Sequence, residues 1–95
     1  MAELLSDGEI DAGLAERPGW RRSGDELSRT VESESFPAAI DLVRRVAEVA
    51  EELNHHPDID IRWRKVTYRV TTHSAGGITQ LDLDLVSKID DLIAS

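Results

Sequence analysis

Cysteine is missing from this sequence, and so is any long run of apolar residues. Without cysteine the chain can form no disulfide, no thiolate nucleophile and no zinc–thiolate site. The lack of disulfides fits a reducing compartment. No stretch approaches the length of a membrane span, and the acidic opening MAELLSDGEIDAGLAER lacks the apolar core of a secretory signal. We therefore expect a cytoplasmic protein with no membrane partner.

Positive charge is also scarce. The sequence has 11 lysines and arginines against 19 aspartates and glutamates, a formal net charge of -8 at pH 7. This excess of negative charge argues against non-specific attraction to nucleic acid or to an anionic membrane surface. We expect no direct binding to nucleic acid.

The chain is short. Its 95 residues suffice for a single domain, residues 1–95, and not for two. The hydrophobic fraction of 40% is that of a globular protein rather than a disordered one. A domain of this size buries a modest core and is often helped by self-association.

Three segments have the pattern of helices. Ser6 and Glu9 stand at the spacing of a capping box, which predicts a short helix over residues 7–16. A second helix is expected over residues 36–54, because apolar residues recur there at helical spacing and a proline follows. Thr79 has the position of an N-cap before a third helix, with an acidic residue three positions later.

The expected middle helix carries one apolar stripe, which we expect to face the core. Val46 and Leu53 widen this stripe. Its main members are Phe36, Ile40, Val43, Ala47 and Ala50.

A hairpin is expected after this helix. Residues 59–63 and 66–71 alternate between apolar and polar side chains, which is the pattern of half-buried antiparallel strands. We expect the tight connection at Arg64-Lys65 and His73 just beyond the end of the second strand. One face of this hairpin is predicted to be polar, with Thr67, Arg69, Thr71, Asp60 and Arg62.

A second hairpin, with a poorer pattern, is expected before the middle helix. Ser23-Gly24-Asp25 is typical of a turn between strands at residues 20–22 and 27–31, although Arg29 interrupts the apolar positions. The full order is helix, strand, strand, helix, strand, strand, helix. It predicts a two-layer α+β fold, in which helices pack on one face of a four-stranded antiparallel sheet.

The stretch EELNHHP holds two of the three histidines. Glu51 precedes His55 by one helical turn, so the side chains can meet and the carboxylate can fix the tautomer of the imidazole. Pro57 is expected to end the helix and let both histidines leave its surface. Taken alone, the pair fits helix capping, metal binding or proton transfer. Capping is the default for such a pair, and the spacing is not that of the HExxH metal motif.

His73 and Asp82 come later in the sequence, and each of them alone also allows more than one interpretation. His73 follows the parity of the polar strand face and has the alternative of an exposed histidine at a strand end. It is also a possible fourth ligand if the EELNHHP stretch binds metal. Asp82 falls at the third position of the last helix, where an acid stabilises the helix without any further function.

The order and spacing of these residues together are a more specific signal of function than any one of them alone. Glu51, His55-His56-Pro57, Trp63, His73 and Asp82 follow one another at a spacing that resembles the signature of the pterin-4a-carbinolamine dehydratases. The resemblance covers the chain from Pro18 onward. Other residues that fall in the order of that family are Gly19-Trp20, Asp25, Phe36, Lys65-Val66, Thr72 and the Asp-x-x-Leu that begins at Asp82.

The resemblance implies an enzyme, a hydro-lyase that dehydrates 4a-hydroxytetrahydropterin to quinonoid dihydropterin. That step recycles the tetrahydrobiopterin cofactor of aromatic amino acid hydroxylases. The resemblance also implies a pterin substrate, no metal and no organic cofactor, a homodimer or homotetramer, and a functional link to such a hydroxylase.

By the same resemblance, His55, His56 and His73 line the pterin site. His55 would be the acid at the 4a-hydroxyl group and His73 the base at N5, while His56 would position the substrate. Imidazole suits both tasks because its reference pKa of about 6.5 lies near neutral pH. Glu51 would orient His55, and Trp63 would pack locally. The residues expected to bind substrate or support the site are Glu51, Asn54, Thr72, Ser74, Ala75 and Asp82.

Relatives with this fold also include non-catalytic binding, assembly or dimerisation factors, which often lack the histidines. Retention of all three favours the enzyme. Two positions depart from the family pattern: Asn54 stands where many relatives have aspartate, and Ala75 stands where some have cysteine. The first departure removes a charge next to the expected site.

Overall fold

The computed structural model describes residues 3–95. Within them the order is α1 (Asp7–Ala15), β1 (Arg21–Ser23), β2 (Glu26–Glu32), α2 (Phe36–Leu53), β3 (Asp58–Arg62), β4 (Lys65–Val70), the 3-10 helix η1 (His73–Ala75) and α3 (Gln80–Ala94). The order predicted from the sequence is confirmed, and η1 is an addition to it.

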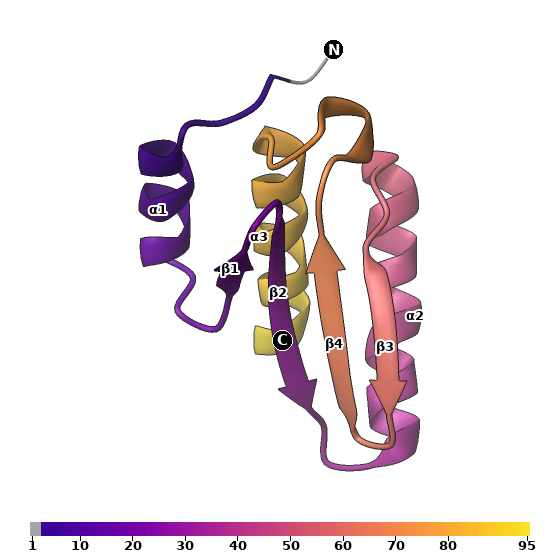
Figure 1. Ribbon diagram of the computed structural model, residues 1–95. Coiled ribbons are helices and arrows are strands. Elements are labelled where there is room, and N and C mark those ends of the chain that lie inside the picture. The colour runs from indigo at the N-terminus through magenta and orange to yellow at the C-terminus, as the bar shows by residue number, and fades with distance from the viewer. Residues whose placement is uncertain (1–2) are drawn as a thin grey trace.

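The four strands form one antiparallel sheet in the order β1-β2-β4-β3. Figure 1 shows α2 and α3 side by side on one face of this sheet, and α1 beyond β1 at its edge. The predicted α+β class is therefore confirmed. In the described part of the chain, no helix is both long and apolar enough to cross a membrane.

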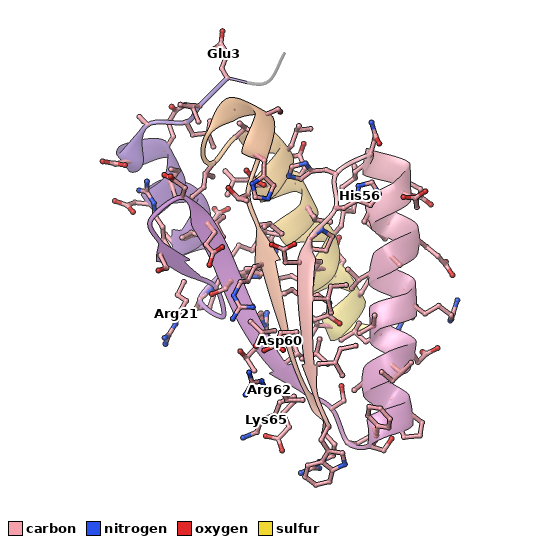
Figure 2. All side chains as sticks on the ribbon, turned by 45° about the vertical axis from the view of Figure 1, so that its right-hand side comes forward. Glu3, Arg21, His56, Asp60, Arg62 and Lys65 are labelled. Atoms are coloured by element: carbon pink, nitrogen blue, oxygen red, sulfur yellow. The ribbon has the colours of Figure 1, made fainter. Side chains whose placement is uncertain are left out.

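The core lies between the sheet and α2 and α3. Alternate residues of β4 are fully buried, with Tyr68 at the centre. From the helices come Ala39, Val46 and Ala50 of α2, and Leu85, Val86 and Ile89 of α3. The intervening residues of β4 belong to the opposite face, which is polar as predicted. There the hydroxyls of Thr30 and Thr67 lie 2.7 Å apart. Figure 2 shows Arg21, Asp60, Arg62 and Lys65 extending from the sheet away from the helices.

Side chains cap all three helices at their N-termini. Both halves of the Ser6–Glu9 capping box are present, as are both halves of the predicted box of Thr79 and Asp82. Ser35 caps α2, and the proline that follows lies in the first turn, as expected.

The predicted apolar stripe of α2 is partly wrong. Val46 and Ala50 are buried as predicted, but Phe36, Ile40 and Ala47 are exposed, and Ala39, which was not predicted, is buried. The buried stripe of α2 therefore runs along Ala39, Val46 and Ala50. The apolar spacing identified the helix but could not choose between two adjacent faces that are both apolar.

Both hairpin turns differ from the prediction by one residue. In the first, Ser23 pairs with Glu26, so the turn is Gly24-Asp25, with Gly24 at φ +60°. In the second, Lys65 belongs to β4 and the connection is Trp63-Arg64. Trp63 has a φ of 56° and is 67% exposed, so it is not a strand residue. The Arg64 guanidinium lies 4.4 Å from the centre of its ring, which agrees with local packing of Trp63.

Arg29 points to the core side of β2. The strand tolerates this charged side chain because a carboxylate of α3 pairs with it. Its guanidinium donates to Asp90 over 2.8 Å, and the indole N–H of Trp20 donates to the same carboxylate over 2.7 Å. Arg17 lies 3.7 Å away. The arginine that made the strand pattern poor is thus paired with a residue of α3.

Candidate active site

The end of α2 sets the direction of His55 and His56. Helix α2 ends at Leu53, and Asn54 adopts the left-handed conformation with φ 51° and ψ 42°. The backbone N–H of Asn54 donates to the carbonyl of Glu51, and that of His55 donates to the carbonyl of Ala50 over 3.0 Å. These are the bonds of a Schellman motif. The helix therefore ends through Asn54, before the proline to which the sequence pattern gave that role.

His55 is held by Asp82, not by Glu51. Its Nε2 lies 2.6 Å from the Asp82 carboxylate, which has no exposed surface, while the His55 side chain is 11% exposed. A carboxylate only accepts hydrogen bonds, so Nε2 carries the proton and Nδ1 is left for other partners. The contact joins residues that are 27 positions apart. The expected support from the start of α3 is present, in direct contact with the imidazole.

Glu51 contacts His56 instead. The Schellman turn carries His55 toward α3, and the following residue folds back along α2 so that its Nε2 meets the Glu51 carboxylate. Both side chains are more than half exposed, so solvent screens this pair much more than the buried His55–Asp82 pair. The prediction that Glu51 orients His55 is wrong, because it assumed that His55 continues the helix.

The buried carboxylate also organises the segment that carries His73. Asp82 accepts from the hydroxyl of Thr72 over 2.8 Å and from the backbone N–H of Thr79 over 2.9 Å. The hydroxyls of Thr72 and Thr79 lie 2.8 Å apart. One carboxylate therefore connects the loop after α2, the end of β4 and the start of α3.

A tight loop presents His73. The backbone N–H groups of Ala75 and Gly76 both donate to the carbonyl of Thr72 over 3.0 Å. Gly76 has a φ of 78°, a conformation that suits glycine and turns the chain back toward α3. His73 is exposed at the start of this loop.

The three histidines border one hollow of about 290 Å³. It lies between the loop after α2 and the loop after β4. Figure 2 shows His56 beside the C-terminal end of α2. Besides the histidines it is lined by Asn54, Thr71, Thr72 and Ser74. Most of the predicted site residues are thus brought together. Ala75 does not line the hollow, and Glu51 and Asp82 each hold a histidine from behind.

Thr71 is the lining residue that sequence reasoning did not select. The sequence did contain a signal for Thr71. Apolar and polar residues alternate over residues 66–71, and this alternation places Thr71 on the polar strand face that leads to His73. Within residues 3–95, no three side chains of histidine, cysteine, aspartate or glutamate are grouped so that they could hold a metal ion. Two imidazoles with carboxylate partners and one without can donate and accept protons around a ligand in the hollow.

Comparison with known proteins also points to a family of pterin dehydratases. The family model described as pterin 4 alpha carbinolamine dehydratase matches residues 3–92. A protein of Nocardia farcinica is 64% identical over 90 residues, which is 95% of each chain. A protein of Roseiflexus sp. strain RS-1 is 54% identical over 93 residues, 98% of this chain and 100% of that one. Both carry the name "putative pterin-4-alpha-carbinolamine dehydratase".

Two solved structures resemble this one. The transcriptional coactivator/pterin dehydratase from Brucella melitensis has a TM-score of 0.89 at 27% identity, covering 93% of this chain and 96% of that one. A pterin dehydratase-like protein described as a RuBisCO assembly factor has a TM-score of 0.68 at 20% identity, covering 81% and 92%, and it supports the fold alone. With a family model matched over residues 3–92 and relatives more than half identical along nearly the whole chain, this protein belongs to the pterin 4 alpha carbinolamine dehydratase family.

Proposed function

We propose that the protein dehydrates 4a-hydroxytetrahydropterin to quinonoid dihydropterin by histidine acid–base catalysis. The observation that carries this proposal is the meeting of His55, His56 and His73 around one hollow, from two segments that are distant in the sequence. Family membership supports it. The same proposal includes a role in pterin recycling beside an aromatic amino acid hydroxylase.

The reaction needs one acid and one base. The C4a–O bond breaks, and because hydroxide is a poor leaving group the oxygen has to take up a proton and leave as water. The N5–H bond breaks as well, and its electron pair forms the C4a=N5 double bond of the product. A positioned imidazole contributes typically 10²–10⁴-fold to such a proton transfer.

The surroundings of the histidines support separate roles for them. The Asp82 carboxylate accepts a hydrogen bond from Nε2 of His55 over 2.6 Å, which fixes the orientation of this imidazole. We therefore assign His55 as the acid that protonates the 4a-hydroxyl group. The exposed His73, at the other side of the hollow, takes the N5 proton, and His56 positions the substrate.

The test is a dehydration assay. We expect the protein to accelerate the loss of water from freshly generated 4a-hydroxytetrahydropterin, followed by ultraviolet absorbance, above the spontaneous rate. His55→Ala and His73→Ala should each lower the enzymatic rate about 10²–10⁴-fold. Equal rates with and without wild-type protein would refute the dehydratase, whereas full activity in either variant would refute that histidine's role.

A non-catalytic binding, assembly or dimerisation role is the second candidate. The observation behind it is the fold shared with a protein described as a RuBisCO assembly factor. The same assay separates the two functions, because an assembly factor has no need of His55 or His73. We favour the enzyme, since three histidines that border one hollow have no evident use in assembly.

A further inference from the structure

A second hollow adjoins the one that the histidines border. It has a volume of about 310 Å³ and lies on the other side of His73. His73 and Thr71 line both hollows, so the two are neighbours that share these side chains as a common wall. The new wall comes from the turn between β1 and β2, where Asp25 and Glu26 contribute two carboxylates.

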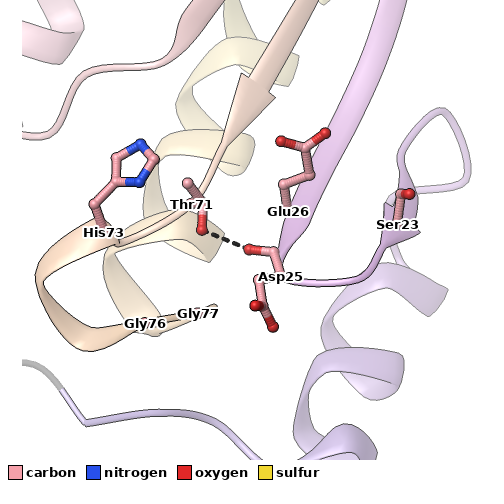
Figure 3. Close-up of a pocket in the computed structure, with 7 residues that line it drawn as sticks. All are labelled: Ser23, Asp25, Glu26, Thr71, His73, Gly76 and Gly77. Atoms are coloured by element: carbon pink, nitrogen blue, oxygen red, sulfur yellow. Dashed lines mark hydrogen bonds between the residues drawn. The ribbon is translucent and has the colours of Figure 1, made fainter.

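The two carboxylates point in different directions. Figure 3 shows the Glu26 carboxylate and the His73 ring extending to the same side of Thr71, while the Asp25 carboxylate points the other way. Asp25 packs against the backbone of Gly77, where a Cβ atom would lie 3.6 Å from its Oδ1. Glu26 is half-buried, and its only ion-pair contact in the described part of the chain is a loose one of 3.8 Å to Arg69. Glu26 is therefore the carboxylate that faces a ligand bound beside the His73 ring.

The register of the sheet places Glu26 near the segment that carries His73. Leu27 pairs with Val70, so Glu26 faces Thr71, and His73 follows two residues later. His73 itself lies in η1, beyond the end of β4, and borders the same hollow of about 310 Å³ as Glu26. A ligand whose reacting edge lies at His73 reaches the Glu26 carboxylate with its far edge.

We propose that Glu26 binds the 2-amino and N3–H groups of the pterin, an inference that rests on the proposed function. These two adjacent N–H groups form a planar pair of donors, similar to the fork of an arginine side chain. A carboxylate accepts such a pair through two parallel hydrogen bonds, which are short and strong when the acceptor is charged. Glu26 thereby selects aminopyrimidine rings and fixes the orientation in which C4a and N5 meet the histidines.

The test compares two stable ligands that differ at a single position. 7,8-Dihydropterin carries the 2-amino group, and 7,8-dihydrolumazine carries an oxygen there, which would face the carboxylate and repel it. We expect wild-type protein to bind the amino compound about 10- to 100-fold more tightly, measured by fluorescence titration. Glu26→Gln should reduce this preference at least tenfold. Asp25→Asn, which removes the same charge from the same hollow, should keep it.

This experiment is independent of the proposed reaction, because neither ligand is dehydrated. Equal affinity of wild-type protein for the two ligands, or no binding of either, would overturn the role of Glu26. So would an unchanged preference in Glu26→Gln. Selective binding without acceleration of dehydration would instead overturn the proposed function and leave Glu26 as a pterin-binding residue.

Discussion

Asp82 combines two tasks in one side chain. It completes the capping box of α3 and accepts a hydrogen bond from His55. Removing the charge of a buried acceptor typically costs about 1–3 kcal/mol. We predict that Asp82→Asn lowers the free energy of unfolding by about this amount, because an amide can replace only part of the network. If the proposed function is correct, the dehydration rate should fall by at least tenfold, because the amide holds the imidazole of His55 less firmly than the carboxylate does.

Urea denaturation and the dehydration assay check this prediction. Asp84→Asn is the matched control, since it removes the same charge from the exposed side of the same helix, where among residues 3–95 Asp84 accepts only from Gln80. We expect this control to change stability by less than about 0.5 kcal/mol. A variant Asp82→Asn with wild-type activity would show that His55 needs no charged partner.

Tyr68 has a buried hydroxyl group without a partner in the described part of the chain. An unpaired polar group in the core is costly, so Tyr68→Phe should leave the protein as stable as before or raise its stability by up to about 1 kcal/mol. The midpoint of urea denaturation at neutral pH measures this. A loss of more than about 1 kcal/mol would reveal a hydrogen bond to an ordered water.

Tyr68 also allows a prediction of how the free energy of unfolding changes at alkaline pH. Burial raises the pKa of Tyr68 to about 12. The unfolded chain releases this proton near pH 10, so below that pH the contribution to stability is complete. Above it the folded state binds more protons, and stability falls by up to about 1.4 kcal/mol per pH unit until the folded pKa is reached. Denaturation midpoints at several pH values should fall less steeply in Tyr68→Phe.

At the scale of the elements, the turn after α2 decides where the histidines point. Asn54 adopts a left-handed conformation that costs most residues about 1–2 kcal/mol and that asparagine and glycine tolerate. Asn54→Val should therefore destabilise the protein by about 1–2 kcal/mol and lower the dehydration rate. Asn54→Gly should keep the backbone turn. Thermal unfolding and the rate of dehydration measure both effects, and wild-type behaviour of Asn54→Val would contradict this role of the turn.

The sequence allowed the elements to be predicted because their signals are local. Two capping boxes, the proline in the first turn of α2 and the alternation of β4 each lie within a few residues. What could not be predicted depends on partners far along the chain. The pairing of Arg29 with Asp90 spans 61 positions, and that of His55 with Asp82 spans 27. Glu51 was assigned to the wrong histidine for this reason, although the three histidines themselves were correctly expected together.

At the scale of the whole molecule, exposed apolar residues gather near the free edge of the sheet. Phe36 and Ile40 belong to the first turns of α2, and Ile61 lies in the edge strand β3; they are 46%, 38% and 42% exposed. Figure 1 shows the start of α2 next to the end of β3. We propose that the chain self-associates through this region, since small domains bury little of their own apolar surface.

Light scattering coupled to gel filtration tests this proposal. We predict a mass of two or four chains for the wild-type protein and a smaller assembly for Ile61→Lys, because a lysine on an edge strand opposes strand pairing and burial. Lys88→Glu, an exposed change on α3, serves as the control and should keep the larger mass. A wild-type protein that elutes as a single chain at all concentrations would contradict the proposal.

The hydrogen bonds of Asp82 have a consequence for how the protein responds to heat. The carboxylate that orients His55 is also the one that begins α3 and joins it to the end of β4. Releasing His55 therefore requires breaking hydrogen bonds of the same carboxylate that holds the fold together at this point. Loss of catalysis on heating should follow the same curve as loss of the fold, and recovery on cooling should return both together.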